Sequence, residues 1–258
     1  MDMIAQPSPQ KPFYTWEERL KYALIPPRLY MWRLLRKYAR KGEAEMKLLP
    51  DLVARDKIAI DVGANKGVYT HTLAKLCREV RAFEPNPKIY RILTRALPHN
   101  AVTYPVALSD TTGTAELIIP AHKRGGFSNQ GASLDARKKA APFGYASATV
   151  ETRTLDSYDF RDVGFIKIDV EGFEEAVLRG AAETLRRERP TVLVEMEERH
   201  TGRPIERSLT DMAAGGFDVS FVRDGRLTPI RAFDPESDHR RRYGQAGYVF
   251  NFILKPVE

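Results

Sequence analysis

Residues 61–67, Asp-Val-Gly-Ala-Asn-Lys-Gly, form a glycine-bearing turn directly after an apolar run. Because glycine has no Cβ, Gly63 allows a sharp turn and Gly67 allows close packing of the following helix. Asp61 ends the apolar run, where a carboxylate can accept a hydrogen bond from a cationic amine. Glu84 ends the next apolar run, where a carboxylate can accept hydrogen bonds from both hydroxyls of a ribose. Together these residues predict a site for an adenosyl amino acid.

Nicotinamide-dependent dehydrogenases use a similar strand, turn and helix, with the fingerprint G-x-G-x-x-G. In this chain Asn65 stands where that fingerprint has its second glycine, which lets the backbone approach a pyrophosphate. Asp61, just before the turn, would also repel a phosphate. The charges therefore favour S-adenosyl-L-methionine over a dinucleotide.

Asp110 follows a third apolar run, in the stretch Ala-Leu-Ser-Asp. Its carboxylate can meet an adenine amino group, or it can simply form the turn before Thr-Thr-Gly. We predict a cofactor site made of the glycine turn and the ends of the second and third strands. Its residues are Asp61, Gly63, Ala64, Asn65, Gly67, Glu84, Ser109 and Asp110.

Two further carboxylates, Asp169 and Glu171, follow another apolar run, and Gly172 lets the chain turn directly after them. Residues two apart on a strand point the same way, so the carboxylates can converge, and their repulsion would raise one pKa. Glu195 ends the next strand, and His200 follows five residues later. We predict Asp169 as the centre of the reactive site, with Glu171, Glu195 or His200 as its general base. Alternatively, Glu171 caps the next helix and His200 is a surface histidine.

The composition restricts metal chemistry and compartment. A single cysteine, Cys77, excludes an internal disulfide and a multi-cysteine zinc site. Asp169, Glu171 and Glu195 offer oxygen ligands that suit Mg²⁺, so a divalent metal is possible, but their spacing does not require one. No apolar run approaches the ~20 residues that span a bilayer, and the N-terminus lacks a secretory signal. We therefore expect a cytoplasmic protein.

The net charge of +7 raises the question of an anionic partner. Most basic residues are scattered among carboxylates, which disfavours nucleic acid, but residues 28–41 and 240–242 are denser. The first segment has apolar residues at helical spacing, among them Met31, Leu34 and Tyr38. It predicts an amphipathic helix that either packs on the domain with a solvated basic face or meets an anionic partner, such as a nucleotide-linked substrate, acidic glycan, RNA or membrane surface. Its exposed face leaves a homo-oligomer open.

The order of the elements predicts the scaffold that positions these residues. From residue 57, short apolar runs alternate with helical stretches, which indicates a doubly wound, Rossmann-like α/β fold. Residues 120–148 form a long loop, either functional or disordered. Residues 1–25 are Pro-rich and expected to be loosely ordered, so we divide the chain into an arm with the amphipathic helix, 1–50, and one domain, 51–258. Strands are expected at 57–62, 79–83, 102–108, 114–119, 148–153, 165–169, 191–195, 217–222 and 248–254, and helices at 67–77, 87–97, 171–189 and 205–214.

Several segments recur in one order and spacing that resembles a known family. They are IDVGANKGVYT (60–70), FEPNP (83–87), ALSD (107–110), TLDSY (154–158), IKIDVEGFE (166–174), VLRGA (177–181) and RPTVLVEMEERH (189–200). Together they resemble the FkbM-type S-adenosylmethionine-dependent methyltransferases over roughly residues 43–200. The resemblance implies a seven-stranded methyltransferase sheet, mostly parallel, with an antiparallel last strand.

The resemblance also implies the reaction, methylation of a hydroxyl on a sugar, glycan or natural product. A hydroxyl is a poor nucleophile at neutral pH, so a positioned base should remove its proton. Two alternatives stay open: a methyltransferase acting on RNA or protein, and a non-catalytic protein that binds the cofactor. The arm, the 120–148 loop and the tail beyond 200 lie outside the resemblance and are expected to select the acceptor.

Overall fold

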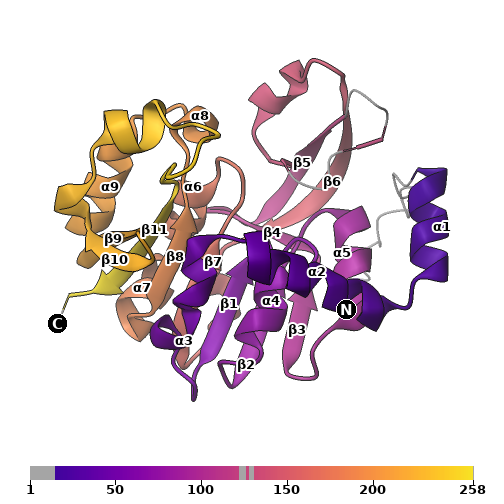
Figure 1. The fold of residues 1–258 in the computed structure, drawn as a ribbon, viewed down its shortest axis with the longest axis horizontal. Coiled ribbons are helices and arrows are strands. Elements are labelled where there is room, and N and C mark those ends of the chain that lie inside the picture. Colours follow the sequence, from indigo (N-terminus) through magenta and orange to yellow (C-terminus); the bar gives the residue numbers. More distant parts are fainter. Residues whose placement is uncertain (1–14, 122–125, 128–130, 258) are drawn as a thin grey trace.

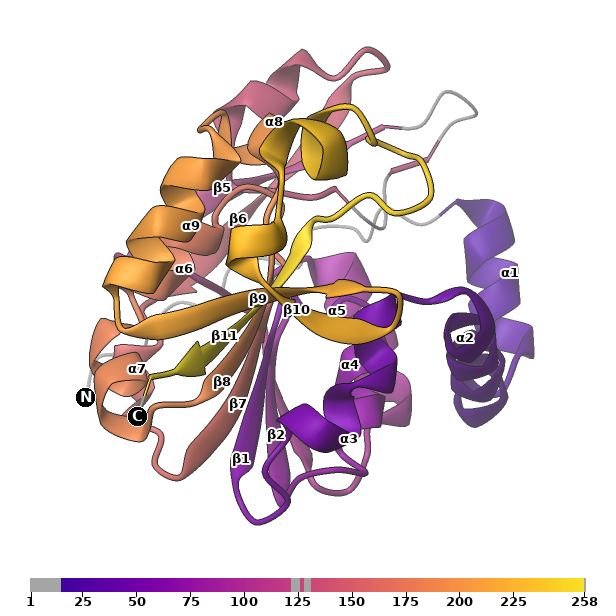
Figure 2. The same cartoon turned by 60° about the vertical axis from the view of Figure 1, so that its left-hand side comes forward.

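The fold is built on one large sheet with helices on both faces (Figures 1 and 2). The computed structural model describes residues 15–121, 126–127 and 131–257. The sheet has eight strands in the order β10-β9-β11-β8-β7-β1-β2-β3. They are β1 (Ile58–Val62), β2 (Glu79–Phe83), β3 (Ala101–Tyr104), β7 (Val163–Ile168), β8 (Thr191–Glu195), β9 (Phe217–Arg223), β10 (Arg226–Pro229) and β11 (Asn251–Pro256).

This sheet confirms the expected doubly wound class, with eight strands in place of seven. Strands β1, β2, β3, β7 and β8 are parallel, and the last strand, β11, lies antiparallel between β8 and β9. The extra strand is β10, which forms a hairpin with β9. Asp224 and Gly225 connect the two strands with positive φ, and an Asp-Gly pair favours such a turn. None of the side chains of β10 is buried, and its sequence has no apolar run that would predict a strand.

A second, three-stranded sheet interrupts the alternation of strands and helices along the chain. The strand expected at 102–108 is two strands, because Pro105, which has no N–H to donate, separates β3 from β4 (Val106–Leu108). β4 pairs with β6 (Tyr145–Arg153), which pairs with β5 (Gly113–Pro120), so both strands expected here are confirmed. The described part of the 120–148 loop contains the 3₁₀ turn η3 (Ala136–Ala140). Residues 122–125 and 128–130 lie outside the described residues.

Helices cover both faces of the main sheet. Figure 2 shows α6 (Glu174–Arg179), α7 (Ala182–Glu188) and α9 (Ile205–Ala214) on one face, and α3 (Leu49–Leu52), α4 (Val68–Leu73) and α5 (Pro87–Leu93) on the other. The helix expected at 171–189 is interrupted at Gly180, where a Cβ would lie 2.0 Å from the carbonyl oxygen of Ser109. Shorter elements are η1 (Ala44–Lys47), η2 (Thr94–Ala96), η4 (Asp156–Tyr158), α8 (Glu198–Thr201), η5 (Ile230–Ala232) and η6 (Pro235–Arg240).

The N-terminal part is more ordered than expected. Residues 16–24, assigned to a loose arm, form helix α1 (Trp16–Leu24), because Thr15 and Glu18 close a capping box. The amphipathic helix is confirmed as α2 (Pro27–Lys41), which buries Met31 and packs on α4 and η2. Residues 1–14 lie outside the described residues. No helix in the described part of the chain is long and apolar enough to cross a membrane.

Side chains along the strands alternate between the two faces of the main sheet. Ile60 and Ile166 face the core under α6 and α9, together with Val194. Their neighbours on the same strands face α4, the side of Tyr69 and Leu73. Near the carboxyl ends of the strands, the residues that point to this same side are polar. They are Asp61, Lys167, Asp169, Glu195 and Asn251.

Candidate active site

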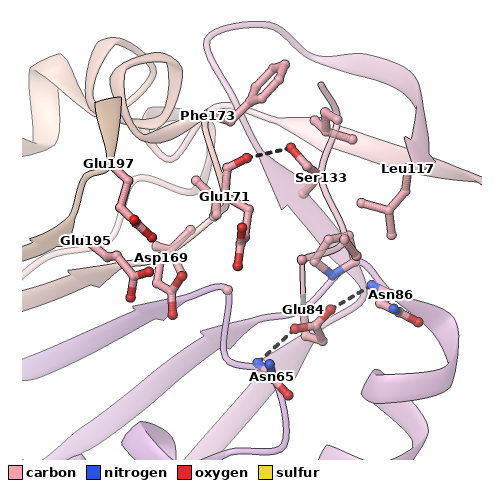
Figure 3. Close-up of a pocket in the computed structure, with 18 of the residues that line it drawn as sticks. Asn65, Glu84, Asn86, Leu117, Ser133, Asp169, Glu171, Phe173, Glu195 and Glu197 are labelled. Atoms are coloured by element: carbon pink, nitrogen blue, oxygen red, sulfur yellow. Dashed lines mark hydrogen bonds between the residues drawn. The ribbon is translucent and has the colours of Figure 1, made fainter. Parts of the chain in front are cut away.

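A cavity of about 460 Å³ opens at the carboxyl ends of β1, β2, β7 and β8, which is where doubly wound sheets bind ligands. The glycine turn and Glu84 form one wall, and Asp169, Glu171 and Glu195 form the opposite wall (Figure 3). Residues from both of the groups predicted from the sequence therefore line one space.

The backbone at Gly63 lies too close to the end of β7 for a side chain at that position. Gly63 adopts a φ of +76°, and a Cβ on it would lie 1.8 Å from the carbonyl oxygen of Asp169. The N–H groups of Gly63 and Ala64 both donate to the carbonyl oxygen of Phe83, at 3.0 and 2.9 Å. These bonds tie the turn to β2. Gly67, at a φ of +87°, precedes α4, and a Cβ there would lie 2.6 Å from Leu93.

Glu84 is fixed by two backbone donors. The N–H of Asn65 donates to Oε2 and the N–H of Asn86 donates to Oε1, each at 2.8 Å (Figure 3). Burial raises the pKa of Glu84 to about 7, although the two backbone bonds oppose this shift. Each oxygen keeps a further lone pair. The carboxylate is therefore oriented and can accept two hydroxyl hydrogen bonds.

Asp61 lies beneath the cavity and is not among its lining residues. Its side chain is fully buried, and Thr70 donates to Oδ2 at 2.6 Å. Oδ1 has no hydrogen-bond partner among the described residues. Burial raises the pKa of Asp61, and the charge of Lys167 opposes that shift. Asp61 thus stands behind the site, with one acceptor atom left unbonded.

Asp169 is paired with a buried lysine. Lys167 Nζ donates to Asp169 Oδ2 at 2.7 Å and lies 4.7 Å from the centre of the Tyr69 ring. Burial acts to lower the pKa of Lys167, but the carboxylates of Asp169 and Asp61 outweigh it and raise that pKa. Lys167 is therefore held as a cation beside the carboxylates of Asp169 and Asp61.

Glu195 and Asp169 lie side by side at the cavity wall (Figure 3). Burial, reinforced by the charge of Asp169, raises the pKa of Glu195 to about 10. Glu195 is therefore protonated at neutral pH. The sequence analysis expected a raised pKa within the pair Asp169 and Glu171, whereas the raised pKa described here belongs to Glu195.

Glu171 is held by partners from two other segments. Its carboxylate lies 3.3 Å from Lys138 Nζ and 3.3 Å from His200 Nε2, and its carbonyl oxygen accepts from Ser133 Oγ at 2.7 Å. Burial lowers the pKa of His200, against the opposing charge of Glu171. The N-cap of α6 is Phe173, and no side chain that the structure describes caps the helix; Glu174, its first residue, accepts from the N–H of Gly172 at 2.9 Å. Of the two readings of Glu171, the structure favours a place in the cavity.

Six predicted residues lie outside the cavity lining: Asp61, Ala64, Gly67, Ser109, Asp110 and His200. Ala64 packs in the core on the α4 side, and Ser109 is buried beside Asp110. Asp110 accepts two bonds from Arg179, at 2.8 and 3.1 Å, and Arg179 lowers its pKa. The cavity instead meets this segment at 106–108.

Further lining residues come from the three regions beyond the resemblance. Glu43 follows α2, Ser133 lies in the 120–148 loop, and Tyr243 and Tyr248 precede β11. None of them has a motif around it, because distant segments meet only in the folded chain. Tyr248 donates to Glu197 Oε2 at 2.6 Å, and this bond raises the pKa of Tyr248, although burial contributes more.

The described residues contain no group of three or more His, Cys, Asp or Glu side chains placed to hold a metal ion. One oxygen of Asp169 is bonded to Lys167 Nζ, at 2.7 Å. The candidate magnesium ligands Asp169, Glu171 and Glu195 thus share a cavity without forming such a group.

The model of the FkbM methyltransferase domain matches residues 61–224, more than half of the chain. No curated protein matches. Similar solved structures include an FkbM methyltransferase from Methylobacillus flagellatus KT, with 11% identity and a TM-score of 0.49 over 88% of this chain. The chain spans about half, 53%, of that protein.

Two others are similar to this chain at a comparable level. One is a TehB-like SAM-dependent methyltransferase from Corynebacterium glutamicum, with 14% identity, a TM-score of 0.47 and coverage of 89% of this chain and 95% of that one. The other is an rRNA methylase from Streptococcus thermophilus, with 10% identity, a TM-score of 0.43 and coverage of 83% and 95%. The family match, which begins at Asp61 of the glycine turn and includes β7 and β8, carries the assignment. The chain belongs to the FkbM family of S-adenosylmethionine-dependent methyltransferases.

Proposed function

We propose that this protein transfers a methyl group from S-adenosylmethionine to a hydroxyl oxygen of a sugar, glycan or natural product. The observation that carries the proposal is that Asp169, Glu171 and Glu195 share one cavity with Glu84 on its opposite wall. A carboxylate near the acceptor hydroxyl can remove its proton, and the enclosed site can hold the reactants in line.

The cofactor would be held by the glycine turn and Glu84. Glu84, already oriented by Asn65 and Asn86, would accept hydrogen bonds from the two ribose hydroxyls. The missing side chain at Gly63 lets the turn pack against the backbone of Asp169, and this packing holds the turn at the cavity wall. When bound, the cofactor supplies an electrophilic methyl group on a sulfonium. The carboxylates on the opposite wall suit that positive charge.

Glu171 would act as the general base. It lies on the cavity wall, and His200 lies 3.3 Å behind it. Because burial lowers the pKa of His200, the imidazole is neutral at pH 7 and can share the proton that Glu171 takes up. Glu195, whose pKa is about 10, would donate a hydrogen bond at neutral pH, and Asp169 would orient the acceptor or the cofactor amine.

Two measurements on the purified protein test this function. Calorimetry should detect S-adenosylmethionine binding that Glu84→Ala weakens strongly. Incubation with hydroxyl-bearing glycans and natural products should yield methylated product, which Glu171→Gln should reduce with cofactor binding retained. Absence of cofactor binding would overturn the whole proposal, whereas binding without transfer to any acceptor would favour a non-catalytic role.

A further inference from the structure

A second concave surface lies between α2, η1 and α4, with a volume of about 450 Å³. Its lining includes four cations, Arg36 and Arg40 from α2, Lys47 from η1 and Lys75 from just beyond α4. Trp32 lies beside them, with Arg36 4.8 Å from the centre of its ring. We call this surface the α2 groove.

The cations of the α2 groove are not neutralised. None of the four forms a salt bridge with a residue that the structure describes, whereas Arg203 and Arg240, on the far side of the molecule, each contact two or more carboxylates. All four side chains are exposed. Among the residues that the structure describes, Glu43 is the only carboxylate that lines the groove. Unpaired cations of this kind attract and bind anions.

The α2 groove adjoins the active-site cavity. Glu43 lines both spaces, directly after the end of α2 at Gly42. Its carboxylate faces the site, because the Tyr69 hydroxyl donates to Glu43 Oε2 at 2.5 Å and Tyr69 lies beneath Lys167. A ligand that extends past Glu43 would therefore enter both the groove and the cavity.

The two adjoining spaces have opposite charge. The cavity is lined by one arginine, Arg199, which already makes two 2.6 Å bonds to Glu197. Its carboxylic side chains are Glu43, Glu84, Asp169, Glu171, Glu195 and Glu197. Such a wall repels a phosphate and suits neutral hydroxyls. The cationic groove next to it suits a phosphate.

We propose that the α2 groove binds the phosphate or pyrophosphate ester of an acceptor whose neutral, hydroxyl-bearing end occupies the cavity. This inference rests on the proposed function for the cavity and adds the class of acceptor, a phosphate-linked sugar or similar compound. Arg36, Arg40, Lys47 and Lys75 contact the phosphate oxygens, and Glu43 separates the phosphate from the reacting hydroxyl. The phosphate belongs either to a free nucleoside diphosphate or to the headgroup of a lipid carrier.

Direct binding tests the groove without methyl transfer. In a Trp16→Phe background Trp32 is the only tryptophan, so its fluorescence reports on the groove. The probes are inorganic pyrophosphate, uridine diphosphate, and vesicles of phosphatidylcholine with and without phosphatidic acid. We expect saturable binding of pyrophosphate that weakens with added salt. If uridine diphosphate binds as well as pyrophosphate, the phosphate belongs to a free nucleoside diphosphate. If the vesicles with phosphatidic acid bind and uridine diphosphate does not, the phosphate belongs to a lipid carrier.

Matched double variants on α2 distinguish a specific phosphate site from general electrostatic attraction to a basic helix. Arg36→Gln with Arg40→Gln removes two groove charges, and Arg28→Gln with Arg33→Gln removes two from residues of the same helix outside the groove. The groove pair should weaken pyrophosphate binding about tenfold or more, and the control pair should leave it within about twofold. Equal losses, or no pyrophosphate binding, would overturn the proposal. Calorimetry with S-adenosylmethionine should give the same affinity for both pairs, so failure of the groove is distinguishable from failure of the proposed function.

Discussion

Lys167 donates to Asp169 from a fully buried position on β7, at 2.7 Å, and the same ammonium interacts with Asp61 on the neighbouring strand β1. The register of these strands pairs Asp61 with Lys167 directly. One cation thus compensates two carboxylates that burial would otherwise penalise. This pairing allows an acidic cluster to persist at the edge of an apolar core.

Lys167→Met should destabilise the protein strongly. Removing the ammonium leaves Asp61 and Asp169 without their buried partner, so we expect a loss of about 3 kcal/mol in the free energy of unfolding. Denaturant titration measures it. Lys138→Met, which removes a more exposed partner of Glu171, should cost less than about 1 kcal/mol. Equal losses in the two variants would contradict this role of Lys167.

Cofactor affinity should depend on the ionisation of Glu84. Because its pKa in the folded protein is about 7, the ionised form that accepts ribose hydroxyls declines as the pH falls below 7. We expect S-adenosylmethionine binding, measured by calorimetry, to weaken between pH 8 and pH 6. Glu84→Gln should bind more weakly at pH 8 and lose this dependence.

A matched control for the pH dependence is Glu45→Gln. Burial raises the pKa of Glu45 to about 7 as well, but Glu45 does not line the cavity. This variant should keep the wild-type pH dependence of binding. If it abolished the dependence while Glu84→Gln preserved it, the assignment to Glu84 would be wrong.

Gly63→Ala should disrupt the cofactor turn. The new Cβ would overlap the carbonyl oxygen of Asp169 at 1.8 Å in a backbone conformation that favours glycine. We expect a loss of about 3 kcal/mol or more in stability, together with loss of cofactor binding. Gly144→Ala has a similar φ of +84° with nothing within 4 Å, so it isolates the backbone cost of about 1 kcal/mol. Thermal unfolding and calorimetry should separate the two variants, and equal behaviour would argue against a close approach at Gly63.

The cavity carboxylates should differ in their pH profiles. Glutamine resembles a protonated glutamate, so Glu195→Gln should keep the rate at pH 7 within about threefold and flatten its change as the pH rises toward 10. Glu171→Gln should lose roughly a hundredfold or more at every pH, because it removes the proposed base. If steady-state rates fell more in Glu195→Gln than in Glu171→Gln, the roles of the two residues would have to be exchanged.

Local patterns predicted that the glycine turn and Glu84 lie together, because one short turn and one strand end build this wall of the cavity. Gly63 and Glu84 could be found from their spacing, since parallel strands bring consecutive βα turns to one edge of the sheet. The same argument brought Asp169, Glu171 and Glu195 together. Asp110 followed the same logic, yet Arg179 from α6 holds it outside the cavity, a contact that no local pattern reveals.

The remaining lining of the cavity could not be predicted residue by residue. Glu43, Ser133 and Tyr248 come from segments far apart in the sequence, and their meeting depends on how α2, the second sheet and the segment before β11 pack. The role of Lys167 likewise depends on tertiary packing, because only the structure shows the carboxylates that compensate its burial.

The most direct test is to follow the methyl group itself. The protein would be incubated with S-adenosylmethionine carrying a ¹³C-labelled methyl and with glycan and natural-product acceptors, and the product would be examined by NMR. We predict that the labelled carbon forms a methyl ether on a former hydroxyl oxygen, and that Glu171→Gln greatly slows its appearance. A label found only on nitrogen, sulfur or carbon would contradict the account.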